Sequence, residues 1–167
     1  MGKLDFDNLM KVVAVTQTSN GTAIVDHDID FDLPRGYIAK IHYVEFSVLI
    51  SNSTPDGFAG FNMALVNDPD DNQTVSIPTD TQSHDVVCEF SGRLRANSTP
   101  GDVAYEPLFA TRAYNFDEMN VDVVAARNMK FNSTQGGTNP VSGHQIRVYY
   151  TLEKVTSKDM LELLDIL

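Results

Sequence analysis

Several residue types and motifs are scarce in this sequence, and each scarcity excludes something. Among 167 residues there is one cysteine, Cys88, so an internal disulfide cannot form. No apolar run reaches the roughly 20 residues of a membrane-spanning helix, and no secretory signal follows Met1. Tryptophan is absent, which weakens a carbohydrate-binding interpretation. These absences predict a protein made in and soluble in a cytoplasm, with Cys88 as a small buried residue.

Basic residues are also few. Twelve Lys and Arg face 23 Asp and Glu, which gives a formal net charge of −11. Affinity for nucleic acid depends on clustered Lys and Arg, and Arg93 with Arg95 is the nearest approach to a cluster. Direct binding to nucleic acid is therefore not expected.

Catalytic and cofactor motifs are missing. The four histidines have no partner at a metal-ligand spacing, and the chain contains no nucleophile elbow, phosphate loop or dinucleotide fingerprint. We therefore expect no enzyme, no cofactor and no metal. A catalytic triad assembled in space stays open, because its members need not be neighbours in the chain.

Alternation with a period of two dominates the pattern that is present. In residues 145–155, Ile146, Val148, Tyr150 and Leu152 share one face, so we expect that face in the core. Residues 37–50 alternate too, with a change of phase that predicts a β-bulge near Val44. Further strands are expected at residues 11–17, 25–32, 58–67, 84–91, 105–112, 119–126 and 128–132.

Turn-rich pieces separate these strands, at residues 18–21, 52–57, 67–72, 96–102 and 134–143, and no amphipathic helix lies between them. Because parallel strands need long crossovers, the sheets should be antiparallel. The predicted fold is all-β: an antiparallel two-sheet β-sandwich of jelly-roll type with a short C-terminal helix.

That helix is expected at residues 157–167, with Ser157 as its N-cap. It is too short to be stable alone and strongly apolar, so it should dock, either on its own sandwich or on a neighbouring subunit. We favour the neighbour, and the predicted subunit-interface residues are Met160, Leu161, Leu163, Leu164, Ile166 and Leu167.

Three polar patterns have two interpretations each. Asp26, Asp28, Asp30 and Asp32 alternate along one strand face, either as a cation site or, as we favour, as a solvated surface. The acidic loop at residues 67–72 is either a calcium site or, as we favour, an ordinary acidic turn. Glycosylation sequons are more frequent than chance predicts, and they begin at Asn20, Asn52, Asn72, Asn97 and Asn132. Glycosylation would explain the excess, but we favour the interpretation that Asn, Ser and Thr are simply common turn residues.

A helix-poor chain with a long final strand, here Gly143 to Val155, and a short helical tail resembles the single jelly-roll capsid proteins of viruses, particularly those of prokaryotic hosts. The resemblance implies an N-terminal arm at residues 1–10, a jelly roll at 11–156 and a helix at 157–167. It implies a virion protein that assembles with copies of itself and with other capsid proteins. The arm holds one Lys and two Asp, unlike the basic, genome-binding arms of small RNA-virus coats.

Two alternatives of other classes stay open. One is a capsid decoration protein or a receptor- or carbohydrate-binding β-sandwich module. The other is a small enzyme of cupin type, which needs a His/Glu metal cluster, and the dispersed histidines count against it.

Overall fold

The computed structural model describes residues 9–19, 25–50, 58–67, 86–95, 108–137, 142–156 and 158. Within these ranges the chain forms nine strands and one short helix, packed as two antiparallel sheets. The predicted two-sheet sandwich is thereby confirmed. The elements are β1 (Lys11–Ser19), β2 (Val25–Ile29), β3 (Tyr37–Ile50), β4 (Phe58–Val66), β5 (Val86–Arg95), β6 (Leu108–Asn115), α1 (Phe116–Met119), β7 (Val123–Ala125), β8 (Met129–Gly137) and β9 (Ser142–Lys154).

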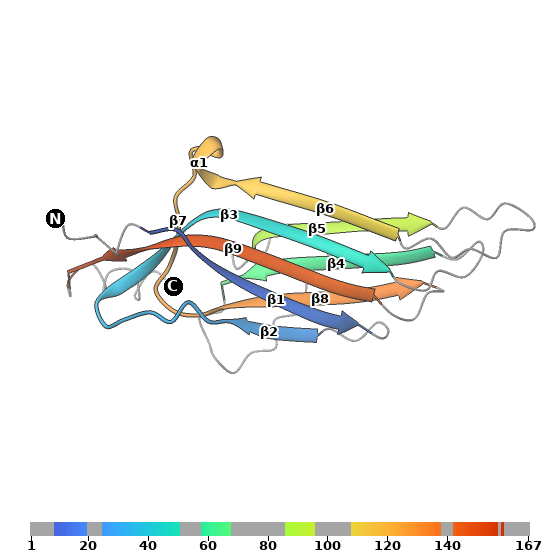
Figure 1. Ribbon diagram of the computed structural model, residues 1–167, viewed down its shortest axis with the longest axis horizontal. Coiled ribbons are helices and arrows are strands. Elements are labelled where there is room, and N and C mark those ends of the chain that lie inside the picture. Colours follow the sequence, from blue (N-terminus) through green and yellow to red (C-terminus); the bar gives the residue numbers. More distant parts are fainter. Residues whose placement is uncertain are drawn as a thin grey trace, which may run out of the picture.

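The strands pair in a nested order. The first sheet has the order β1-β9-β3-β6, with β7 also paired to β3, and the second has the order β2-β8-β4-β5. Leaving β7 aside, β1 pairs with β9, β2 with β8, β3 with β6 and β4 with β5 (Figure 1). The chain therefore follows the path of one long hairpin of eight strands wrapped over itself. At the two lateral rims β1 lies beside β2, and β5 lies beside β6.

The apolar core lies between the sheets and is built from the alternating faces of the strands. Ile146 and Val148 of β9 are fully buried, and Tyr150 and Leu152 of the same face are 5% exposed. The predicted orientation of this strand is therefore confirmed. Cys88 of β5 joins the same core, and loss of solvent around its thiol raises the pKa well above the ordinary value. The thiol is thus inert, as a small buried residue should be.

The predicted bulge in β3 exists, two residues before the expected position. The ladder between β3 and β9 shifts register between Ile41 and Tyr43, so His42 is the extra residue. One inserted residue lets Ile41 and Val44 both face the core, which is the change of phase seen in the sequence. The bulge also turns the His42 side chain away from the core.

The second strand ends earlier than predicted, at Ile29. Asp32 has a positive φ of 49°, and its backbone N–H donates to Asp30 Oδ1 at 2.8 Å. A short polar side chain tolerates this conformation better than most residues and stabilises the turn locally. His27, which the alternation places on the core-facing side, is exposed.

Two other segments differ from expectation. The strand expected at residues 119–126 is reduced to the three residues of β7, because α1 precedes it. Asn115 caps this helix by accepting from Glu118 N at 3.3 Å, and Asn120 ends it with a φ of 54°. Much of the turn expected at residues 134–143 is strand instead, because β8 continues to Gly137 along β4 and β9 begins at Ser142.

Apart from Lys158, the C-terminal helix predicted at residues 157–167 lies outside the described residues, as do residues 1–8 of the N-terminal arm. Among the described helices, none has the length and apolarity that crossing a membrane requires.

Candidate functional site

The first candidate surface is an apolar pair on the outer face of the first sheet. Leu49 of β3 and Phe109 of β6 are register partners, so their side chains lie next to each other. Phe109 is 63% exposed and Leu49 is 45% exposed. Single exposed apolar residues are ordinary, but a neighbouring pair that reaches the edge strand β6 is typical of a contact surface. The pair lies at the end of the sandwich where β3 finishes.

More exposed apolar side chains lie at the opposite end of the same sheet, on its two edges. Met119 and Val121 follow β6 on one edge, and Leu9, Met10 and Val12 lie around the start of β1 on the other edge. Figure 1 shows α1, which carries Met119, projecting from the end of β6. Among the described residues, the exposed large apolar side chains are therefore concentrated at the ends and edges of the first sheet.

A polar chain of three side chains lies beside α1. Both carboxylate oxygens of Asp117 lie about 3 Å from His42 Nδ1, at 3.0 and 2.9 Å, and His42 Nε2 lies 2.8 Å from Thr151 Oγ1. Because a carboxylate only accepts, Nδ1 carries a proton, and in the neutral tautomer Nε2 accepts from the Thr151 hydroxyl. The three residues come from α1, the β3 bulge and β9, so the network fastens α1 onto the first sheet.

An acid–imidazole–hydroxyl order is also the order of a nucleophilic triad. The sequence could not reveal it, because His42 is 75 residues from Asp117 and 109 from Thr151. A triad also needs donors placed to stabilise an oxyanion. Thr151, however, lies within β9, and its register partner is Lys40 of β3. The Lys40 ammonium forms an ion pair with Asp122 at 3.0 Å, so this cation is engaged by a carboxylate rather than placed to stabilise an oxyanion. We therefore interpret the network as a tether.

Polar side chains fill the interior at one end of the sandwich, which we call the polar end and define by Gln17, Ser133, Gln135 and His144, all 5% exposed or less. Ser133 Oγ donates to Gln17 Oε1 at 2.9 Å, and Gln17 Nε2 donates to Phe131 O at 3.0 Å. Since Gln17 belongs to β1 whereas Ser133 and Phe131 belong to β8, these bonds join the two sheets. Each such buried bond contributes about 1 kcal/mol, and losing one partner costs more.

His144 is the titratable group of the polar end. It pairs with Gln17 of β1 and Val48 of β3, and burial lowers the pKa of its imidazole to about 4. The ring is therefore neutral near pH 7. Leu49 and Phe109 lie on the outer face of the first sheet at this same end of the molecule.

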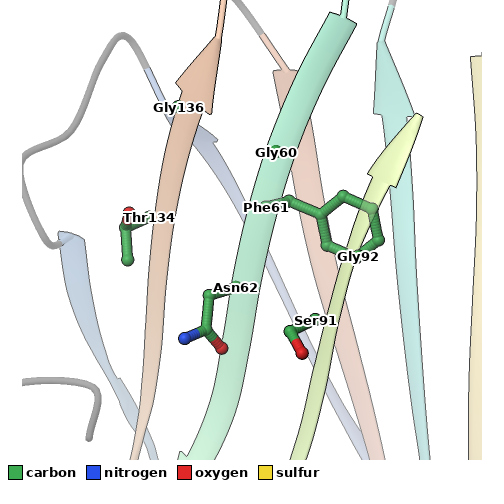
Figure 2. Close-up of a pocket in the computed structure, with 7 residues that line it drawn as sticks. All are labelled: Gly60, Phe61, Asn62, Ser91, Gly92, Thr134 and Gly136. Atoms are coloured by element: carbon green, nitrogen blue, oxygen red, sulfur yellow. The ribbon is translucent and has the colours of Figure 1, made fainter. Parts of the chain in front are cut away.

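A shallow hollow of about 340 Å³ opens on the outer face of the second sheet, also toward the polar end. Figure 2 shows that its lining comes from β8, β4 and β5, with Asn62 on the central strand and Thr134 and Ser91 on either side. Glycines make up much of the rest of the surface. The lining residues are Gly60, Phe61, Asn62, Ser91, Gly92, Thr134 and Gly136.

The residues predicted for function are placed unevenly. Met160, Leu161, Leu163, Leu164, Ile166 and Leu167 all lie outside the described residues, so their predicted interface role stays a prediction. Asp26 and Asp28 are exposed on β2, whereas Asp30 and Asp32 lie in the turn after it, so the four aspartates do not form one continuous ladder. The described residues contain no group of three or more potential metal ligands.

One glycosylation sequon lies in an unexpected place. Asn132 is in the interior of β8 and is fully buried, although the sequence places it beside a turn. An oligosaccharide cannot be attached there in the folded protein. The other four sequon asparagines and residues 68–72 of the acidic loop lie outside the described residues.

No protein-family model matches the chain, and no curated protein sequence matches it. Two solved structures show a low similarity. One, from Desmodium yellow mottle tymovirus, is 12% identical and covers 94% of this chain and 97% of its own, with a TM-score of 0.34. The other, from the T13 particle of IBDV, is 9% identical and covers 88% of this chain, with a TM-score of 0.35. This chain matches 36% of the length of the IBDV chain.

Proposed function

We propose that this protein is a virion structural protein, with a jelly-roll fold, that assembles with copies of itself into a capsid shell. The observation that carries the proposal is the nested pairing β1/β9, β2/β8, β3/β6 and β4/β5. With β7 left aside, the eight remaining strands have the order that a jelly roll requires, and viral capsids, lectins and cupins are built on that fold.

The distribution of exposed apolar residues favours assembly among these three classes. A shell subunit must contact neighbours on more than one side, and the first sheet carries exposed apolar residues at both ends and on both edges. The excess of acidic residues supports a role in protein contacts rather than in direct genome binding. A cupin enzyme would need a metal-binding His/Glu cluster.

The C-terminal segment is proposed as one of the contacts. Its apolar residues, Met160, Leu161, Leu163, Leu164, Ile166 and Leu167, are too many for an isolated 11-residue segment in water. A terminal segment can reach a neighbouring subunit without changing the fold of its own sandwich.

Size-exclusion chromatography and negative-stain microscopy of the full chain test the proposal. We expect discrete trimers, pentamers or shells, and a strict monomer at high concentration would contradict the proposed function. Deletion of residues 158–167 should then abolish assembly while leaving a folded subunit with a cooperative thermal transition. Loss of folding would instead show that the segment docks on its own sandwich, and no change in either property would exclude both roles.

A point variant on the described surface complements the deletion. Phe109→Ser removes the most exposed large apolar side chain of the described residues without touching the core, so we expect weaker assembly and an almost unchanged melting temperature. Thr111→Ser is the matched control, because Thr111 lies on the same exposed face of β6. Equal assembly of both variants and the wild type would remove the Leu49–Phe109 pair from the interface.

A further inference from the structure

The two lateral rims of the sandwich differ in the sign of their charge. β5 and β6 together contain three basic residues and one acidic residue, although the whole chain has a net charge of −11. β2 and the turn after it, residues 25–32, contain four aspartates, all exposed, and no Lys or Arg. β1 adds one charged residue, Lys11, at its first position. Figure 1 shows the two rims on opposite long sides of the molecule, with β6 along one and β2 along the other.

Arg112 is an exposed cation of the β5/β6 rim. Its register partner Phe46 is fully buried, so Arg112 lies on the core-facing side of β6 and yet remains exposed. This combination places the guanidinium at the rim, 5.3 Å from the centre of the Tyr114 ring. It forms no ion pair within the described part of the chain, and the aromatic ring does not neutralise it. Arg112 can therefore pair with a carboxylate of another molecule.

His27 occupies the corresponding place on the β1/β2 rim. Its register partner Phe131 is fully buried, so His27 also lies on the core-facing side of an edge strand and is exposed. Asp26 and Asp28 flank it, and neither forms an ion pair with any residue that the structure describes. Lys130 of β8 lies opposite Asp28, which leaves Asp26 as the less screened carboxylate.

The cation and the aspartates lie near the same cross-section of the sandwich. Arg112 is in the row of the first sheet that ends at Val15 of β1. Gln17, the next core-facing residue of β1, donates to the carbonyl of Phe131, the register partner of His27. Two residues along a strand span about 7 Å, so the two charged positions differ in height by about that much. Subunits placed side by side, with a small shift, bring them together.

Opposite charges on opposite rims discriminate between two ways in which copies can meet. If like rims met, Arg112 would face a second Arg112, or aspartates would face aspartates, and both arrangements are repulsive. If unlike rims meet, Arg112 faces Asp26 and Asp28. A contact between two different surfaces is heterologous, and it closes into a ring when the rotation between subunits permits.

We propose that copies of this protein form a ring in which the β5/β6 rim of one subunit contacts the β1/β2 rim of the next. This inference rests on the proposed assembly into a shell and specifies which surfaces meet. Exposed apolar residues lie on the same two edges, with Phe109 on β6 and Val12 on β1. Their burial stabilises the contact, and the charges determine which rim meets which.

Charge reversal on each rim tests this contact, with oligomer size measured by analytical ultracentrifugation of the full chain. Arg112→Glu makes both rims acidic. Asp26→Lys combined with Asp28→Asn gives the β1/β2 rim a positive charge without placing a second lysine opposite Lys130. Each should raise the dissociation constant of the assembly about tenfold or more, with an almost unchanged melting temperature, because the changed residues are exposed. Lys154→Glu, on the interior strand β9, is the control and should assemble like the wild type.

Two further measurements separate a lost contact from a damaged subunit. One chain with all three substitutions exchanges the charges of the rims, so its dissociation constant should return to within about threefold of the wild type. An equimolar mixture of the two single-rim variants should co-assemble, because each then meets a neighbour of opposite charge.

The outcomes also separate this contact from the proposed function. If the wild type assembles and Arg112→Glu assembles equally well, the rim contact is wrong while the shell proposal stands. A charge-exchanged chain that folds but stays monomeric would likewise overturn the rim contact alone. A monomeric wild type contradicts both.

Discussion

His144 illustrates how one buried side chain links solution conditions to stability. Its imidazole lies among Gln17 and Val48 of the adjacent strands, and no charged residue is among these register partners. The folded protein therefore holds it neutral, with a pKa of about 4, whereas an unfolded chain has an ordinary histidine pKa near 6.5. The unfolded state binds a proton first as the pH falls.

We expect this difference to make the protein less stable in mild acid. The contribution of His144 is complete above about pH 6.5 and is lost progressively down to about pH 4, by an amount on the order of 3 kcal/mol. Urea unfolding at pH 7, 5.5 and 4 measures it against His144→Gln, which does not titrate while the carboxylates stay the same. Curves that remain parallel for the two proteins would contradict the prediction.

Val148 and Arg147 are neighbours in β9 with opposite surroundings. Val148 is fully buried, whereas Arg147 points outward and lies 3.7 Å from Glu45 in a partly exposed ion pair. Val148→Asp places a charge in the core and should abolish folding, judged by circular dichroism and the loss of a thermal transition. Arg147→Ser should cost under about 1 kcal/mol, because exposed ion pairs contribute little. A reversed result would mean that the faces of β9 are swapped.

At the scale of elements, the sequence predicts best where local pattern and burial agree. β3 and β9 are long and alternate on either side of the bulge at His42, so their core faces were predictable from residues such as Val148 and Phe46, although β9 begins three residues before the predicted start. The helix α1 was not, because four residues are too few to show a helical period. The end of β2 was missed because Asp30 and Asp32 continue the alternation although their backbone turns.

The candidate sites were less predictable than the fold. The sequence predicts a bulge in β3 but does not show which side chains lie beside it. The contact of His42 with Asp117 and Thr151 also depends on how distant segments pair. The hollow depends on Gly60 and Gly136 meeting across two strands, and glycine in a sequence is read first as a turn residue.

The tether of α1 leads to a prediction for local stability. Asp117→Ala removes the acceptor for His42, so the segment containing α1 and β7 should open more easily while the core stays intact. Hydrogen exchange of the amides in residues 116–125 should become about tenfold faster, equivalent to one lost hydrogen bond. Glu118→Ala, the loss of the adjacent negative charge, is the control. Unchanged exchange in Asp117→Ala would show that the network does not hold α1.

At the scale of the molecule, the two sheets present different outer surfaces. The first carries the exposed apolar residues and the α1 tether, and the second carries exposed aspartates on β2 and the glycine-lined hollow. The polar end unites three features: the buried Gln17–Ser133 link, the Leu49–Phe109 pair and the hollow. The two outer faces thus differ in the side chains that they present to solvent.

The nested pairing also decides when the protein can fold as it is synthesised. The last strand, β9, lies between β1 and β3, so the first sheet has a gap until residues 142–154 have left the ribosome. Until then β1 has no strand to pair with in the first sheet, and β3 is paired on one side only, with β6 and β7. Pairings between distant segments form slowly and leave apolar strands open to aggregation, so a nascent chain of this topology is exposed to aggregation until β9 pairs.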